Sequence, residues 1–256
     1  MSWDERQRAM LAEMGLRLPV RAPAAGAPDE PAVAVIERPP APAPAPVISR
    51  PPVAAPAPRI APAPPTHFAG LDAAALREAV STCRGCGLCE QRRNAVYGNG
   101  ALQQAQWLVV TDPPDDADDA SGQAMGADAG RLLDRMLLAA GQRRTGDQPT
   151  AFVTPIVKCR PPRGRAPQPA ELDACEAVLA RQVELLQPRL VLALGMQAAR
   201  RLTGLAEPLG KLRGRVHAWR GLPVVVTYHP AYLLRSPADK AGAWDDLRLA
   251  CASAKS

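Results

Sequence analysis

Four short runs of apolar residues alternate along the chain with longer segments of helical periodicity. Apolar runs of this length predict buried β-strands, here at residues 107–111, 152–157, 190–194 and 224–228. Apolar residues recurring every three or four positions predict helices, here at residues 129–141, 169–186, 196–203 and 238–252. Strands and helices are therefore expected to alternate from residue 107 to near the C-terminus.

This alternation predicts an α/β fold with a parallel sheet. Helical crossovers between parallel strands are almost always right-handed and place helices on both faces of the sheet. We therefore expect a three-layer α/β/α domain around a central four-stranded parallel sheet. Open sheets of this kind bind ligands beyond the carboxyl ends of their strands, so the segments that follow the strands are the candidates for function.

The first quarter of the chain has a different composition. Sixteen of the 29 prolines in the whole chain lie between Pro19 and Pro65, mixed with alanine. Because proline lacks an amide donor and fixes φ, residues 19–66 are predicted to be a disordered, extended linker. The folded domain is expected at residues 67–256, which is long enough to bury one core.

Residues 1–18 predict a short amphipathic helix ahead of this linker. A serine and a glutamate three residues apart match the capping box, and Trp3, Met10 and Met14 can share one face. A helix of this length is marginal by itself. It is either a frayed tail or a peptide that docks into a groove of another protein, and the register of its large apolar residues favours docking.

The N-terminus has no apolar signal core, and no run approaches the roughly 20 apolar residues that a membrane span requires. We therefore expect a cytoplasmic protein with reduced thiols and no membrane partner, which disfavours disulfides among the six cysteines.

Four of the cysteines have a spacing suited to a metal centre, and they are Cys83, Cys86, Cys159 and Cys175. The C-x-x-C pair can reach one centre from a single turn, and the two distant thiols can close the shell from other segments. Spacing alone leaves three alternatives, namely an iron–sulfur cluster, a zinc site and inert buried thiols. Cys89 continues the spacing and is an alternative ligand, whereas Cys251 is expected to be a bystander.

Polar residues follow each predicted strand. Asp112 ends the first strand, Cys159 and several basic residues follow the second, and His229 follows the fourth. Because the carboxyl ends of parallel strands meet at one edge, a carboxylate, an imidazole, a cysteine ligand and cationic side chains are expected at the same crevice.

The ordered set of motifs in the domain resembles the iron–sulfur uracil-DNA glycosylases of family 4, in the uracil-DNA glycosylase superfamily. The matching segments are CRGC at 83–86, YGNG at 97–100, WLVVTDPPD at 107–115, GRLLDRML at 130–137, IVKCRPPRGRAPQP at 156–169, LALG at 192–195, KLRGR at 211–215 and HPAYLLR at 229–235. This resemblance covers about residues 76–248 and implies a uracil-DNA-glycosylase-like fold.

The resemblance also implies an activity, a cofactor and residue roles. The activity is hydrolysis of the N-glycosidic bond of uracil or another damaged base during base-excision repair. His229 would donate to the uracil oxygen and stabilise the departing anion, while Asp112 would hold water and favour the cationic sugar. Cys83, Cys86, Cys159 and Cys175 would bind a four-iron, four-sulfur cluster, with zinc the lesser alternative.

The chain departs from the family pattern at the predicted base pocket, which comprises Thr111, Pro113, Met125 and Pro155. Where the family has GE(A/G)PG, this chain has TDPPD at 111–115, followed by further aspartates. Such a loop would repel DNA, and its other interpretation is an acidic, solvated loop with no catalytic duty.

Two of these pocket positions concern how the base is read. Pro155 replaces the asparagine that reads the uracil edge in the family, and it has neither a side-chain donor nor an amide proton. Met125 stands where the family stacks a phenylalanine, and it lacks a ring face. Uracil selectivity is therefore expected to be poor, or the scaffold has lost the reaction.

DNA is the expected partner because the formal net charge is +6 and basic residues cluster after the strands. The predicted phosphate-binding residues are Lys158, Arg160, Arg163, Arg165, Lys211, Arg213, Arg215 and Arg235. A nucleoid-associated location would follow from such binding.

An alternative function arises from residues 1–18, which resemble the docking peptide of the psi subunit of the bacterial DNA polymerase III clamp loader. That subunit has a folded part like an inactive uracil-DNA glycosylase. A tethered peptide, a proline-rich spacer and an altered active site would together fit a non-catalytic replisome adaptor bound to another clamp-loader subunit.

Overall fold

The computed structural model describes residues 68–254, and the predicted helix at 1–18 and linker at 19–66 lie outside these residues. Six strands are present in the described part: β1 (Asn99–Gly100), β2 (Trp107–Thr111), β3 (Ala151–Pro155), β4 (Leu190–Leu194), β5 (Val216–Trp219) and β6 (Leu222–Thr227). The α-helices there are α2 (Ala73–Ser81), α3 (Asp116–Ser121), α4 (Ala127–Ala139), α5 (Pro169–Leu186), α6 (Met196–Thr203), α7 (Leu209–Leu212), α8 (Pro230–Arg235) and α9 (Lys240–Ser253). Short 3₁₀ turns occur at η2 (Gly87–Glu90), η3 (Pro162–Gly164) and η4 (Pro237–Asp239).

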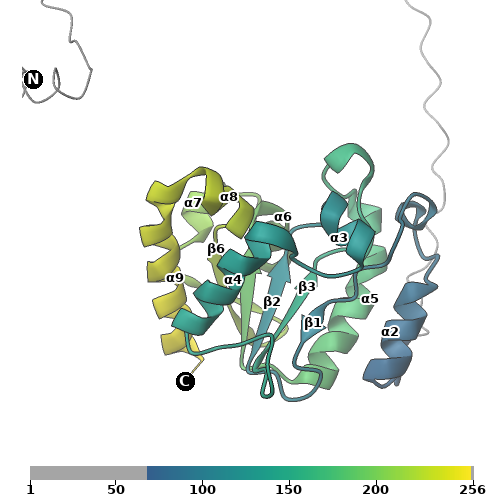
Figure 1. Ribbon diagram of the computed structural model, residues 1–256, viewed down its shortest axis with the longest axis horizontal. Coiled ribbons are helices and arrows are strands. Elements are labelled where there is room, and N and C mark those ends of the chain that lie inside the picture. Colours follow the sequence, from purple (N-terminus) through teal and green to yellow (C-terminus); the bar gives the residue numbers. More distant parts are fainter. Residues whose placement is uncertain (1–67, 255–256) are drawn as a thin grey trace, which may run out of the picture. The chain divides into compact units, whose positions relative to one another are not determined.

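The strands form one sheet in the order β1-β3-β2-β4-β6-β5 (Figure 1). The four inner strands are parallel to one another, which confirms the predicted α/β fold and its central parallel sheet. The two edge strands are antiparallel, so the sheet has six strands and not four. The sequence concealed β1 and β5 because β1 is only two residues long and β5 alternates exposed and half-buried positions.

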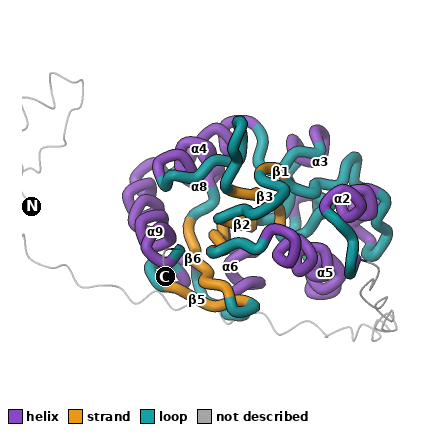
Figure 2. Tube along the Cα trace, turned by 90° about the horizontal axis from the view of Figure 1, so that it is seen from below, coloured by secondary structure: helices purple, strands orange, loops and turns teal. Residues whose placement is uncertain are grey.

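Helices cover both faces of the sheet, as Figure 2 shows in a view along its layers. On one face α5 and α6 bury Leu179 and Leu202 against the sheet, and α2 packs on α5 and buries Leu76 in the same core. On the other face α4, α8 and α9 bury Leu133, Leu233 and Leu247. The strand interiors are buried on both faces, which is why they read as continuous apolar runs.

The predicted boundaries differ from the observed ones by a few residues. The last helix begins at Lys240 because the 3₁₀ turn η4 occupies the residues before it. The second predicted strand ends early, at Pro155, because the chain turns there toward the cysteine-bearing segment.

Phe152 anchors the edge of the sheet. Its ring lies edge-on to Tyr97 at a centroid distance of 5.8 Å, and it is fully buried. Gly100 of β1 pairs with Phe152 of β3. At Gly100 φ is +128°, and a Cβ would lie 2.2 Å from the Ala151 carbonyl oxygen. A side chain is therefore excluded at Gly100, and the two-residue strand β1 can approach β3 closely.

Replacing Phe152 with alanine is expected to lower the free energy of unfolding by about 3–5 kcal/mol, because a fully buried ring is lost and a cavity remains. Urea unfolding followed by circular dichroism measures this loss. Leu102→Ala is the control, since Leu102 is exposed and should cost less than about 0.5 kcal/mol. A loss of under about 1 kcal/mol at Phe152 would contradict the anchoring role.

Candidate functional site

The carboxyl ends of β2, β4 and β6 meet at one edge of the sheet, and main-chain hydrogen bonds tie them together. The Asp112 amide donates to the Leu194 carbonyl at 3.2 Å, and the Gly195 amide donates to the Thr227 carbonyl at 3.1 Å. Asp112 and His229 therefore leave the sheet from the two strands that flank β4. In Figure 1, α3 and α8, which follow these strands, lie at this same end of the sheet.

The Asp112 carboxylate lies at the N-terminus of α6. Its Oδ1 accepts hydrogen bonds from the Gln197 and Ala198 amides at 2.8 and 2.9 Å. Burial raises the pKa of Asp112 to about 6, and the amides at the helix terminus act in the opposite direction. The carboxyl group of Asp112 is therefore mainly ionised at pH 7, and it becomes protonated as the pH falls through about 6.

Gly195 makes this arrangement possible. Its φ is +97°, and a Cβ at this position would lie 2.2 Å from Oδ2 of Asp112. No side chain fits between the carboxylate and the start of α6 without displacing one of them.

His229 caps α8 and is half-buried. Its Nδ1 accepts a hydrogen bond from the Ala231 amide at 3.3 Å, so the neutral ring carries its proton on Nε2. Burial lowers the pKa of His229 to about 4, with Asp115 opposing and Arg235 reinforcing the shift. Capping of α8 uses only one ring nitrogen of His229 and leaves Nε2–H as a donor.

The predicted base-pocket residues occupy different depths. Thr111 and Pro155 are buried and face each other in the register of β2 and β3. Met125 is also buried and belongs to the apolar layer between α4 and the sheet, together with Leu194. Pro113 is half-buried in the segment that leaves β2.

The acidic segment after β2 is largely structural. Asp115 caps α3 by accepting from the Ala117 and Asp118 amides at 2.9 Å. Asp118 accepts from the Gly126 amide at 3.0 Å, and Asp119 accepts from the Arg93 amide at 3.0 Å. The interpretation as a solvated acidic loop is wrong for Asp118 and Asp119, because both are buried and bound to main-chain amides.

The four predicted cysteine ligands line one cavity between α2, α5 and the segment after β3, together with Cys89, Arg92 and Lys158. Arg92 donates to Sγ of Cys159 at 3.1 Å and to the Ser81 carbonyl at 2.6 Å. Burial raises the pKa of Cys159 to about 11 and that of Cys175 to about 12, while the neighbouring cations act in the opposite direction. Deprotonated sulfurs here need a positive charge beside them, as a metal centre supplies.

Lys158 does not contact DNA phosphates, contrary to the prediction. It is only 2% exposed, and its Nζ donates to Thr154 Oγ1 at 2.6 Å and to the Pro155 carbonyl at 2.7 Å. Burial lowers its pKa to about 7, with Cys175 and Cys159 opposing the shift. Lys158 lies in the core, where it lines the same cavity as Cys159. A pattern of charges along the sequence cannot show that a lysine is buried.

Arg213 is a second predicted DNA contact that is internal. Its guanidinium donates to the Asp246 carboxylate at 2.6 Å and lies 3.8 Å from the ring centroid of Tyr228. Tyr228 in turn stacks on Tyr232 at 5.1 Å. Arg213 therefore supports the residues on both sides of His229, and its guanidinium is already engaged by a buried carboxylate and an aromatic ring.

The remaining basic residues lie nearer the surface. Arg160 pairs with Asp116, Arg165 with Glu171 and Arg215 with Glu207. The exposed members of the set are Arg163, Lys211, Arg215 and Arg235.

Arg144 had no signal in the sequence that marked it as functional. It donates to main-chain carbonyls of the segment that carries Met125. Carbonyl acceptors are present at every position of a chain, so the sequence cannot show which arginine will bind them. The peptide at 1–18 that resembles a clamp-loader subunit lies outside the described residues, and its docking stays a prediction.

Replacing Arg213 with methionine is expected to lower the free energy of unfolding by about 3–5 kcal/mol, because the Asp246 carboxylate is left buried and unpaired. Thermal or urea unfolding measures this loss. Arg215→Met is the matched control, since the ion pair of Arg215 is exposed and is worth about 1 kcal/mol at most. Unchanged stability of Arg213→Met together with a weaker salt dependence of DNA binding would restore the phosphate-binding role.

Comparison with known proteins places this geometry in a family. A family model of the uracil DNA glycosylase superfamily matches residues 97–248. The type-4 uracil-DNA glycosylase of Pyrobaculum aerophilum is 38% identical over 176 residues, covering 66% of this chain and 87% of that protein. That of Thermotoga maritima is 35% identical over 161 residues, covering 62% of this chain and 81% of that protein. The chain belongs to the uracil DNA glycosylase superfamily.

Proposed function

We propose that this protein is a uracil-DNA glycosylase that hydrolyses the N-glycosidic bond of uracil in DNA during base-excision repair. The observation that carries the proposal is the presence of an anionic Asp112 and a neutral His229 at the ends of β2 and β6, the two strands that flank β4. The relatives with which the chain shares most of its length are named type-4 uracil-DNA glycosylases, which supports the same activity.

His229 supplies the electrophile. A base must be extruded from the helix before its glycosidic bond can be cleaved, and negative charge then develops on the departing ring. The Nε2–H of His229 is fixed by the hydrogen bond at Nδ1, so it can donate to a uracil oxygen. Because the ring is neutral, it strengthens this hydrogen bond as charge develops without having to release a proton.

Asp112 supplies the negative charge on the sugar side. Its Oδ1 is held by two amides, and this fixes the orientation of the carboxylate before substrate binds. The remaining acceptor positions can hold the attacking water and stabilise the cationic sugar. The buried environment strengthens this interaction but also raises the pKa, so ionised Asp112 is lost below about pH 6.

Pro155 lies at the position that would recognise the edge of the base, and it offers few hydrogen-bonding groups for this purpose. Pro155 has no amide proton, and its carbonyl already accepts from Lys158 at 2.7 Å. The position that reads uracil in the family therefore offers no free donor and an occupied acceptor. We propose that discrimination depends on the shape of the pocket, so that other damaged bases compete with uracil.

The cysteine-lined cavity is proposed to hold a four-iron, four-sulfur cluster bound by Cys83, Cys86, Cys159 and Cys175. Among the described residues, no three Cys, His, Asp or Glu side chains are close enough to hold a single metal ion. A cluster spreads its ligands over several irons, so thiols around a shared cavity suit it better than they suit one zinc ion. The cluster would crosslink the Cys83 segment to the segment after β3 and to α5.

The proposed DNA-binding surface consists of Arg160, Arg163, Arg165, Lys211, Arg215 and Arg235. Arg163 is exposed in the turn after the second parallel strand, and Arg160 and Arg165 line a surface pocket with it. No helix in the described part of the chain is long and apolar enough to span a bilayer. We propose a cytoplasmic, nucleoid-associated location on the basis of DNA binding.

The function is tested with oligonucleotides that contain one uracil, as single strands and as duplexes, followed by alkaline cleavage of abasic sites. The wild type is expected to give strand scission. Asp112→Asn should fold, because an amide oxygen can still accept from Gln197 and Ala198, yet its kcat should fall by about 10²–10⁴-fold. A metal-loaded wild type without scission at protein excess would overturn the proposal.

The same assay gives a pH profile. The kcat/KM of the wild type should be flat at neutral pH and fall tenfold per unit below about pH 6, where Asp112 becomes protonated. His229, with its pKa near 4, stays neutral over this range and adds no second step above pH 5. A profile that stays flat down to pH 4.5, or one that falls equally in Asp112→Asn, would contradict the role of Asp112.

The cluster is tested by Cys159→Ser, with Cys251→Ser as the matched control because Cys251 lies in α9 away from the cavity. Anaerobically purified wild type and control should be brown and contain iron, whereas Cys159→Ser should be colourless and unfold at lower denaturant. Visible absorption, iron content and urea unfolding measure these outcomes. A colourless wild type with stoichiometric zinc would contradict the cluster.

A further inference from the structure

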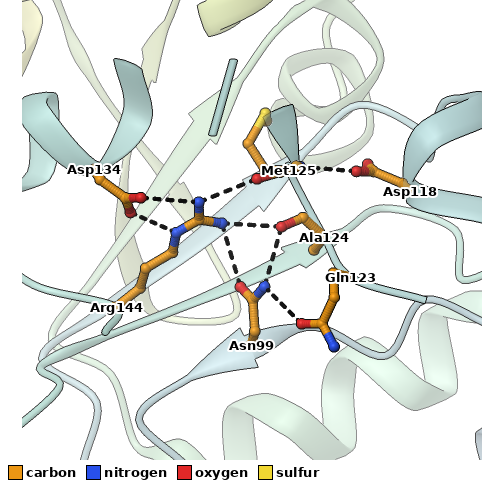
Figure 3. A network of polar contacts seen from close by, with 8 residues as sticks. Asn99, Asp118, Gln123, Ala124, Met125, Asp134 and Arg144 are labelled. Carbon is orange, nitrogen blue, oxygen red and sulfur yellow. Dashed lines mark hydrogen bonds and ion pairs between the residues drawn. The ribbon is translucent and has the colours of Figure 1, made fainter. Parts of the chain in front are cut away.

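The short segment at residues 123–126, which carries Met125, is held by side chains from three other parts of the chain (Figure 3). These side chains are Asn99 of β1, Asp118 of α3 and Arg144 of the turn between α4 and β3, with Asp134 of α4 as the partner of Arg144. We call this set the Arg144 clamp. Asn99 and Asp134 lie in the YGNG and GRLLDRML motifs, whereas Asp118 and Arg144 lie outside every motif of the resemblance.

Arg144 provides most of the contacts. Its side chain is 8% exposed, and its two terminal nitrogens donate to the Ala124 carbonyl at 2.9 Å and to the Met125 carbonyl at 3.1 Å. Its Nε donates to Asp134 at 2.6 Å and Nη2 donates to the other oxygen of Asp134 at 3.2 Å. The ion pair fixes the planar guanidinium, and the guanidinium then fixes two successive peptide groups.

The other members hold the two ends of the segment. Asn99 donates to the Ala124 carbonyl at 3.1 Å and to the Gln123 side-chain oxygen at 3.3 Å. Asp118 accepts from the Gly126 amide at 3.0 Å. Main-chain groups at three successive positions are therefore bound by side chains, which is unusual for a connecting segment.

The clamp holds Met125 in a backbone conformation that the residue would not adopt freely. Its φ is +56°, in the left-handed region that disfavours a residue with a Cβ. The start of α4 presses on the same peptide, since a Cβ at Gly130 would lie 2.1 Å from the Met125 carbonyl oxygen. Such a conformation persists only where the surroundings over-determine it, and it is typical of functional segments.

We propose that Arg144 is a positioning residue that orients Met125 as the surface against which the extruded base packs. Met125 is a flexible, unbranched side chain, so only a fixed backbone can make it a defined wall of the pocket. This inference rests on the proposed glycosylase function, because it assigns a role within the same site. The clamp would replace the rigidity that an aromatic ring provides by itself.

The first test measures the clamp without using activity. In Arg144→Gln, amide hydrogen exchange in a peptide covering residues 118–130 should accelerate at least tenfold, while peptides covering β3 and α9 stay protected. Arg143→Gln is the matched control, because Arg143 is the exposed neighbour of the same residue type, and it should change nothing. Unchanged exchange in Arg144→Gln would overturn the clamp.

The second test asks whether Arg144 acts through Met125. Arg144→Gln and Met125→Ala should each lower kcat/KM on the uracil oligonucleotide by about tenfold, and the double variant should fall no further than Met125→Ala alone, within twofold. Multiplying effects in the double variant would overturn the positioning role. In both single variants the single-turnover rate should fall while KM changes little, because base packing follows DNA binding.

If Arg144→Gln does not fold, Asp134→Asn is used in its place. This variant keeps Arg144 but removes the carboxylate charge that fixes the guanidinium. Exchange at residues 118–130 should again rise, and the same non-additivity with Met125→Ala is expected. If the wild type itself cleaves no uracil oligonucleotide, the proposed function fails, and the hydrogen-exchange comparison still decides whether the clamp exists.

Discussion

The Asp112 carboxylate fits against the first turn of α6 only because residue 195 is a glycine and because β2 and β4 run parallel in register. The first condition leaves room for the carboxylate, and the second brings the ends of both strands to the same height. The amides of the helix then stabilise the ionised carboxylate, whereas burial by itself favours the protonated form. Strand β6 lies on the other side of β4 and places His229 at the same edge of the sheet.

A different constraint governs the cysteine-lined cavity. There the thiols come from three segments of the chain, and burial disfavours their charged forms. Arg92 and Lys158 offset only part of this cost. The folded domain therefore has one site that main-chain hydrogen bonds organise, at the strand ends, and one cavity lined by thiols whose charged forms burial disfavours.

The sequence predicted the parallel sheet well because its inner strands are buried on both faces and have threonine as their only polar residue type. It predicted Asp112 and His229 together because strand ends in a parallel sheet share an edge. It could not predict that Lys158 and Arg213 are internal, since a basic residue beside prolines or glycines has the same pattern whether its partner is a phosphate or a buried carboxylate. Asp118 and Arg144 were equally hidden, because both bind main-chain groups.

The hydrogen bond between the Ala231 amide and Nδ1 of His229 has a consequence for how the site tolerates change. The ring tautomer is selected by a peptide group and not by a second ionisable side chain, as it is in a carboxylate–histidine pair. Nearly every amino acid at position 231 would supply the same amide, so drift at that position leaves the donor nitrogen unchanged. Proline is the exception, because it alone removes the amide proton and would free the imidazole to exchange its two forms.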